Sequence, residues 1–351
     1  MLEQLVMSQF PISQSPNLQS PTQRARGALL GVAIGDAMGA PVEGRTAAEI
    51  RQQYGRIQGF LSDAAVGTDD TDFTLFNAHL LLSFGSEITL EQVEAEWRRC
   101  LLSGDWFYRP GGFSDVVSTR NLAAGMHAPY SGAFGHQMWS DGVAMAISPA
   151  GILAAGDPAL AARLAVTLGS VSNGRDGVWA AQAVAAAIAV AMVGASPHEM
   201  LTTALAFIPP DSWTYRALQR AAAVSERFSD DLDSALQQLS DEIVVSWWPW
   251  ADLVTEAVPL AFGAFLATQG EFQRAVPAGV SLGRDADTIG AIVGSLAGAY
   301  GGRNAIPDAW AARTLVSAGK CIGFVAGMEI EKVAERLVAA REERQGDKVT
   351  G

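Results

Sequence analysis

The sequence predicts an all-α protein, folded as an orthogonal bundle of many helices. Apolar residues recur at helical spacing along nearly the whole chain, and short alternating runs of Val, Ile and Thr bounded by turns are almost absent. Helix breakers such as Ser196-Pro197 and Pro209-Pro210 separate the apolar runs from one another. No shift in composition marks a domain boundary, so we expect a single domain over residues 23–342.

The predicted helices follow these runs in chain order. They cover residues 24–40, 71–84, 89–102, 142–155, 158–170, 177–194, 198–207, 213–226, 231–245, 252–268, 286–300, 308–317 and 320–342. The stretch from Val178 to Ala195 is long enough to cross a membrane, but it consists mostly of Ala and contains Gln182. Ala contributes little to membrane insertion, so we expect this helix to lie buried in the core of a soluble protein.

Two of the predicted helices carry a glycine at every fourth position. These are Gly31, Gly35 and Gly39 in the first helix and Gly290, Gly294 and Gly298 in the second. A glycine inside a helix costs about 1 kcal/mol relative to Ala, and close approach of another helix against the bare face offsets that cost. We therefore expect these two helices to lie in the middle of the bundle.

The composition excludes several classes of protein. The chain has 351 residues, of which 49% are hydrophobic, so it is long and apolar enough to bury a large core. Its 37 acidic and 24 basic residues give a net charge of −13, which argues against binding to a nucleic acid duplex or an anionic membrane surface. Two cysteines, Cys100 and Cys321, are too few for a disulfide scaffold, so we expect a cytoplasmic protein.

The two ends of the chain differ from the helical part. Residues 1–22 are rich in Ser, Gln, Asn and Pro and lack the pattern of a secretory signal, so we expect a flexible N-terminal arm. Residues 343–351 are expected to form a charged C-terminal tail.

Three acidic clusters are the strongest functional candidates. They are Asp36 with Glu43, Thr68-Asp69-Asp70, and Asp285-Ala286-Asp287-Thr288. The second and third precede apolar helical runs, so helix capping explains either of them taken alone. A metal site is the alternative, because neighbouring carboxylates repel one another and a divalent cation removes that cost. An all-oxygen donor set suits Mg²⁺, Mn²⁺ or Ca²⁺, and two ions about 4 Å apart are common in hydrolases.

Three sequence blocks resemble the signature blocks of the ADP-ribosylglycohydrolase family. They are GALLGVAIGDAMGAPVEG, GTDDTDFTLF and GRDADTIGAIVGSLAGAYGG, in the family's order. The resemblance implies the family's all-α fold and hydrolysis of a glycosidic bond at the ribose anomeric carbon of an ADP-ribosylated protein or small-molecule glycoside. It also implies two bound Mg²⁺ or Mn²⁺ ions, whose ligands fall on Thr68, Asp69, Asp70, Asp285, Asp287 and Thr288.

The resemblance further implies which residues carry the chemistry. Glu43 matches a mobile active-site carboxylate of the family. The cations would orient the ribose diol and position a water for attack through an oxocarbenium-like state. Glu43, Asp69 and Asp70 are the candidates for the general acid or base, and the sequence does not choose among them.

Substrate-binding candidates come from a segment that resembles the family's Asn/Asp-Gly-x-x-Met-Arg-x-x-Pro. In this segment the residues near the substrate are Asp141, Gly142 and Met145, and Ala146 stands where Arg is usual. Asn173 similarly stands where relatives often carry His, and the loss of two cationic side chains weakens the recognition of a phosphate. The remaining candidates are Arg284 and the loop residues Gly111 and Gly112, which we expect to be flexible or to cradle a phosphate.

The segment Trp247-Trp248-Pro249-Trp250 has two interpretations. It forms a stacking surface for an adenine or a sugar, or it packs in the core.

Two alternatives to the family's activity also remain. The departures at Ala146 and Asn173 favour a nucleoside or another small glycoside as substrate, whereas the intact metal-binding positions argue against a catalytically silent binding or structural protein.

Overall fold

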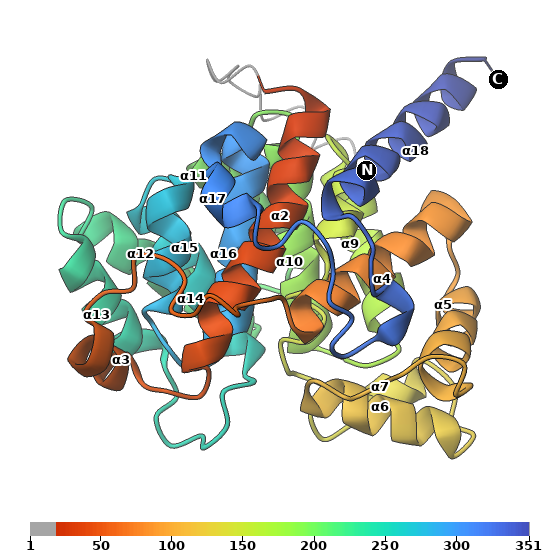
Figure 1. Ribbon diagram of the computed structural model, residues 1–351, viewed down its shortest axis with the longest axis horizontal. Helices are drawn as coiled ribbons and strands as arrows, with labels where there is room; N and C mark the ends of the chain where they lie inside the picture. The colour runs from red at the N-terminus through yellow and green to blue at the C-terminus, as the bar shows by residue number, and fades with distance from the viewer. Residues whose placement is uncertain (1–18, 351) are drawn as a thin grey trace.

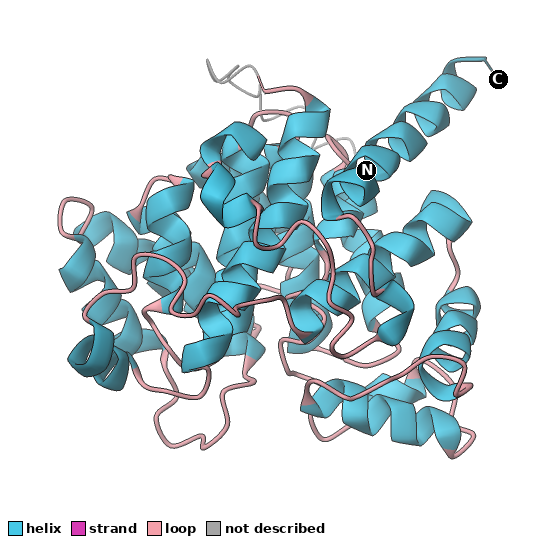
Figure 2. Ribbon diagram, viewed as in Figure 1, coloured by secondary structure: helices cyan, strands magenta, loops and turns pink. Residues whose placement is uncertain are grey.

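The structure, a computed structural model, describes residues 19–350, with side chains described as far as residue 343. Most of the expected N-terminal arm, residues 1–18, lies outside the described residues. Within the described range the regular elements are helices, joined by loops and a few isolated β-bridges, which confirms the predicted all-α class (Figure 2).

The α-helices follow one another along the described part of the chain. They are α2 (Pro21–Gly39), α3 (Ala47–Tyr54), α4 (Asp69–Phe84), α5 (Leu90–Trp97), α6 (Phe113–Ala123), α7 (Tyr130–Ala133), α8 (Ser148–Leu153), α9 (Pro158–Gly169), α10 (Asp176–Ala191), α11 (Pro197–Ala206), α12 (Trp213–Arg227), α13 (Leu232–Ile243), α14 (Val254–Ala267), α15 (Phe272–Val280), α16 (Ala286–Gly301), α17 (Asp308–Ala311) and α18 (Ile330–Thr350).

The glycine-bearing helices α2 and α16 lie against each other in the middle of the molecule, as predicted (Figure 1). A methyl group placed on Gly31 would lie 2.0 Å from the carbonyl oxygen of Gly294, and one placed on Gly294 would lie 2.0 Å from that of Gly31. The two backbones therefore touch directly, and only glycine fits at the contact.

The other helices pack around this central pair. Helices α12, α13 and α15 lie on one side of it in Figure 1, and α4, α5 and α6 lie on the other. The Ala-rich helix α10 is buried and packs against α8, α9 and α11, as expected for a core helix. No helix in the described part of the chain is both long and apolar enough to cross a membrane.

The arrangement brings the ends of three helices together. Helix α2 leads through a short 3₁₀ turn, Ala40–Val42, to Glu43. Helix α4 begins at Asp69, and α16 begins directly after Asp285. The three acidic clusters of the sequence thus lie at the ends of the two central helices and of α4.

Two of the predicted helices are wrong over much of their length. In residues 308–317 only α17 is helical, and in residues 320–342 the long helix begins at Ile330. The carboxylate of Asp72 on α4 accepts hydrogen bonds from the hydroxyl of Ser317 at 2.9 Å and from the N–H of Cys321 at 2.8 Å. A distant carboxylate therefore binds polar groups of this segment and holds it as an irregular connection.

The local pattern also missed some helices and overextended one. Helices α3, α6, α7 and α15 were not predicted. Helix α3 buries only Ile50, which leaves little apolar pattern to recognise, and α15 contains Pro277, a residue that usually breaks a helix. The helix predicted over 142–155 is regular only in α8.

Candidate metal centre and active site

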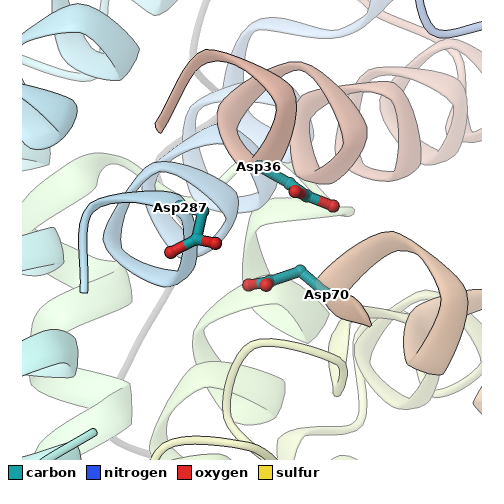
Figure 3. A group of neighbouring side chains, drawn as sticks. All are labelled: Asp36, Asp70 and Asp287. Carbon is teal, nitrogen blue, oxygen red and sulfur yellow. The ribbon is translucent and has the colours of Figure 1, made fainter. Parts of the chain in front are cut away.

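Three carboxylates from α2, α4 and α16 converge at one point of the structure. Asp36, Asp70 and Asp287 are buried, and each offers an oxygen within 4.8 Å of the others. Figure 3 shows the three side chains pointing toward one another. A second group consists of Glu43, Asp285 and Asp287, whose oxygens also lie within 4.8 Å of one another. Asp287 belongs to both groups. Each group could hold a cation, and two cations held in this way would share Asp287.

Asp36 also organises the loop that leads into α4. Its carboxylate accepts hydrogen bonds from the N–H and the hydroxyl of Thr68, both at 2.7 Å, and from the N–H of Thr71 at 3.0 Å. The Thr71 hydroxyl donates to it as well. Asp36 therefore fixes the start of α4, where Asp69 and Asp70 stand. The sequence places Asp36 in the first acidic cluster but does not reveal this supporting role, which depends on contacts between distant residues.

Packing these carboxylates together is electrostatically unfavourable. Burial raises the pKa of Asp36 to about 7, in spite of the hydrogen bonds from Thr71 and Thr68. Burial and the charges of Asp36 and Asp287 raise the pKa of Asp70 well above its usual value. Burial raises the pKa of Asp287 in the same direction, with contributions from Asp285 and Glu43. The Oδ1 atom of Asp70 is buried and has no hydrogen-bond partner among the described residues. A bound cation would satisfy this oxygen and remove the repulsion.

A cavity of about 300 Å³ opens over this cluster and is lined by most of the predicted site residues. Those residues are Glu43, Asp69, Asp70, Gly111, Gly112, Asp141, Gly142, Met145, Asp285, Asp287 and Thr288. Glu43 is exposed as a residue, but the surrounding protein partly desolvates its carboxyl group, and this desolvation together with the charge of Asp69 raises its pKa. We refer to this space as the acidic cavity.

Three predicted site residues do not line the acidic cavity, namely Thr68, Asn173 and Arg284. The Thr68 hydroxyl donates to Asp36. Asn173 is buried, and its amide nitrogen donates to the carbonyl of Ser140 at 3.0 Å. The guanidinium of Arg284 binds Glu256 on α14.

The Gly111-Gly112 loop is held in place by Asp115. The carboxylate of Asp115 accepts hydrogen bonds from the N–H of Gly111 at 3.0 Å and of Gly112 at 2.9 Å. Both N–H groups are thus occupied by a protein carboxylate. A methyl group on Gly111 would lie 2.0 Å from the carboxylate oxygen Oδ2 of Asp69, so glycine makes room for Asp69 at the cavity.

The structure adds residues to the acidic cavity that the sequence did not single out. They include Ser140 and Asp252, and Phe113, which follows the predicted Gly111-Gly112 loop, also lines the cavity. The backbone N–H of Asp141 donates to the carbonyl of Asp252 at 3.2 Å, and each of these residues has a buried Oδ2 atom without a partner in the described part of the chain. In the sequence, the position of Asp252 beside the tryptophan segment could have indicated that it lies at the cavity.

The tryptophan segment lies at the cavity and outside the core. Trp247 is 75% exposed and Trp250 is 47% exposed, which excludes core packing for these two side chains. Trp250 lines the acidic cavity, and its ring contacts those of Phe113 and Trp248 edge to face. Trp248 instead lines a separate cavity of about 280 Å³, together with Trp139, Trp213 and Trp247. We call residues 245–253 the tryptophan loop and this second space the tryptophan-lined cavity.

Comparisons with known proteins agree with this architecture. A solved structure described as an ADP-ribosylglycohydrolase-related protein complex is similar with a TM-score of 0.59 and 25% identity, covering 92% of this chain and all of the other. An uncharacterised protein of Archaeoglobus fulgidus is 30% identical over 303 residues, covering 82% of this chain and 90% of the relative. The ADP-ribosylarginine hydrolase Tri1 of Pseudomonas putida is 25% identical over 322 residues, covering 90% of this chain and 77% of the relative.

The comparison with protein families covers nearly the whole sequence. The family model described as ADP-ribosylglycohydrolase matches residues 17–347, a range that contains all three acidic clusters and every helix from α2 to α17. The chain therefore belongs to the ADP-ribosylglycohydrolase family.

Proposed function

We propose that this protein is a hydrolase that depends on two divalent cations and cleaves the glycosidic bond at the ribose anomeric carbon of an ADP-ribosyl conjugate. The convergence of buried, mutually repelling carboxylates from α2, α4 and α16 beneath an open cavity is the observation that carries the proposal. Family membership supports the reaction class.

The residues present fit a pair of hard cations. Oxygen atoms of Thr68, Asp69, Asp70, Asp285, Asp287 and Thr288 are the proposed ligands, and the unpartnered Oδ1 of Asp70 is an available donor. When bound, such ions orient vicinal hydroxyl groups and polarise a water molecule. Because Asp36 already accepts hydrogen bonds from Thr68 and Thr71, we assign to it the task of holding the ligand loop in place.

Proton transfer is best assigned to Glu43. It is exposed at the acidic cavity, where substrate and water arrive, whereas Asp70 is buried beneath it. Its raised pKa brings it closer to the working pH of an acid or base. Gly44 follows it with φ of +76°, a conformation that glycine adopts without steric strain. The rim residues Phe113 and Trp250 would cover the reacting carbon and exclude water.

The test is product mass spectrometry on a pooled panel of ADP-ribosylated arginine, serine and nucleobase conjugates beside plain nucleosides, with Mg²⁺ or with EDTA. We expect release of ADP-ribose that requires the metal. The double variant Asp69→Asn with Asp287→Asn should lose the activity and the stabilisation by Mg²⁺, while Asp230→Asn, an exposed acid outside the cavity, should retain both. A double variant that keeps the wild-type stabilisation by Mg²⁺ would show that the cation does not bind at Asp69 and Asp287. A wild type that gains no stability from Mg²⁺ and releases no product would favour a binding or structural role.

A second candidate substrate class is a nucleoside or another small glycoside. It is favoured by the charge of the acidic cavity, whose lining contains seven carboxylates and, among the described residues, no Lys, Arg or His. The carboxylates are those of Glu43, Asp69, Asp70, Asp141, Asp252, Asp285 and Asp287. A diphosphate would find no cationic side chain there to pair with. Metal-dependent release of free ribose from a nucleoside, without release of ADP-ribose, would select this candidate.

A further inference from the structure

Arg284 lies at the junction of three segments that border the acidic cavity. It stands directly before Asp285 and has φ of +59°, in the left-handed region that few side-chain-bearing residues adopt. Its N–H donates to the carbonyl of Arg45 at 2.7 Å, and its own carbonyl accepts from the N–H of Gly44 at 2.8 Å. The backbone of Arg284 thus joins the Asp285 loop to the loop that carries Glu43.

The side chain of Arg284 makes a different set of contacts, to the tryptophan loop. Its Nη2 atom donates to the carbonyl of Trp250 at 2.6 Å and to that of Trp248 at 3.2 Å. Its Nε atom donates to Glu256 at 2.8 Å. Glu256 in turn accepts from the N–H of Val245 at 2.7 Å, at the start of the same loop. One guanidinium with its carboxylate partner therefore holds the tryptophan loop at its start and in its middle.

This ion pair is shielded from water. The side chain of Glu256 is fully buried, and that of Arg284 is 13% exposed. A planar guanidinium presents its donors in a fixed fork, so it can bind a carboxylate and two carbonyls at once in one orientation. Lysine carries a single ammonium and cannot span the same acceptors with the same geometry.

The loop that Arg284 holds forms a wall between two cavities. Trp250 lines the acidic cavity, and Trp248 lines the tryptophan-lined cavity. Both carbonyls bound by Arg284 belong to these two residues. The position of the guanidinium therefore sets the position of both rings relative to Glu43 and Asp285.

We propose that Arg284 is a positioning residue, which fixes the tryptophan loop as the wall of the acidic cavity and so determines the affinity for substrate. This inference rests on the proposed function, because it takes the acidic cavity as the site of reaction. It differs from the sequence-based expectation of a direct contact between Arg284 and substrate, since the guanidinium faces Glu256 and the loop carbonyls.

The experiment compares Arg284→Gln, Arg284→Lys and the control Arg26→Gln. Arg26 also forms an ion pair, with Glu335, but neither residue lines either cavity. Three quantities are measured for each variant: kcat and KM with the most active conjugate of the panel, Mn²⁺ stoichiometry by calorimetry, and hydrogen exchange of peptides covering residues 245–253.

We expect Arg284→Gln to raise KM about tenfold with a smaller change in kcat. The displaced loop would weaken binding of the substrate and of the transition state equally, while the reacting groups stay in place. Exchange in residues 245–253 should become faster, and the Mn²⁺ stoichiometry should stay at the wild-type value. Arg284→Lys should recover part of the KM, and Arg26→Gln should resemble the wild type. A purely structural role would lower the fraction of active protein and leave KM unchanged.

The outcomes separate this inference from the proposed function. An active wild type with unchanged KM or unchanged exchange in Arg284→Gln overturns the positioning role alone. Loss of Mn²⁺ binding in Arg284→Gln also overturns it, because the residue would then act through the metal ligands. A wild type without any metal-dependent product overturns the proposed function, and with it the role of Arg284 in substrate affinity.

Discussion

Asp70 has unfavourable electrostatic surroundings within the proposed metal centre. It is buried, one of its oxygens has no partner among the described residues, and the charges of Asp36, Asp287 and Asp69 all raise its pKa. These surroundings favour the protonated form of Asp70 in the metal-free fold. A bound cation would compensate the negative charge of Asp70 and make its ionised form favourable. The carboxylate that would bind the cation therefore lowers the stability of the metal-free fold.

Asp70→Asn is predicted to stabilise the metal-free protein and to abolish its response to metal. The amide removes the repulsion and needs no proton, so the free energy of unfolding without metal should rise by about 1 kcal/mol. The stabilisation by Mn²⁺ should be lost because an essential ligand oxygen is gone. Thermal unfolding with and without Mn²⁺ measures both effects, with Asp230→Asn as the exposed control. A destabilised metal-free variant would show that the Asp70 carboxylate is satisfied within the protein itself.

At the scale of helices, the contact between α2 and α16 sets the spacing between Asp36, which holds the ligand loop, and Asp287, a proposed metal ligand. Asp36 lies on α2 and Asp287 on α16, one turn or less from glycines of the contact. A methyl group at Gly35 would lie 2.0 Å from the carbonyl oxygen of Gly290. Any substitution that pushes the helices apart therefore also moves two carboxylates of the centre.

Gly31→Ala is predicted to destabilise the protein by about 2 kcal/mol, because overlap with the backbone of Gly294 outweighs the gain of about 1 kcal/mol in helix propensity. Urea unfolding of the metal-free protein measures this change. Gly59→Ala is the matched control, since a methyl group there would lie 3.8 Å from Trp310, an ordinary contact distance. Equal stability of the two variants would show that α2 and α16 can separate without cost.

The elements also show how far the sequence could predict the structure. Helices with regular apolar spacing, such as α9 and α10, were found because their pattern is local. The glycine spacing further predicted the α2–α16 contact. Residues 312–317 and 320–329 were assigned to helices in error, since their conformation depends on the carboxylate of Asp72, about 250 positions away in the chain. No local pattern contains such a contact.

In the candidate site, too, the residues with a local sequence pattern could be predicted, and those that depend on distant contacts could not. The acidic clusters were visible because each one is a short motif at a helix end. The positions of Asp252 and Arg284 depend on the tryptophan loop and on Glu256, which fold onto the cavity from another part of the chain. The occupation of the Gly111 and Gly112 N–H groups by Asp115 was local in sequence, but it required the loop conformation to be known.

At the scale of the whole molecule, the proposed metal centre joins the two halves of the chain. Its carboxylates come from α2 and α4 near the N-terminus and from α16 near the C-terminus, so the site exists only when the central bundle is assembled. A cation that binds this site binds the folded state and not the unfolded one, and its binding free energy adds to the stability of the whole domain.

This linkage makes the effect of metal depend on pH in a predictable direction. The folded-state pKa of Asp36 is raised to about 7, and those of Asp70 and Asp287 are raised well above the value of about 3.9 for an unfolded chain. The folded protein thus retains protons that the unfolded chain has lost. The stability that Asp36 contributes is complete below about pH 4 and is lost as the pH rises through about 7, and the raised pKa values of Asp70 and Asp287 act in the same direction.

A divalent cation replaces those protons, so its stabilising effect should be larger where the carboxylates would otherwise be forced to ionise together. We predict that the gain in melting temperature on adding Mg²⁺ is greater at about pH 8 than at about pH 5, measured at constant ionic strength. The variant Asp69→Asn with Asp287→Asn should show little gain at either pH. An equal gain at both values in the wild type would mean that the cluster is already ionised in the metal-free fold, and that its neighbours, not a cation, compensate the charge.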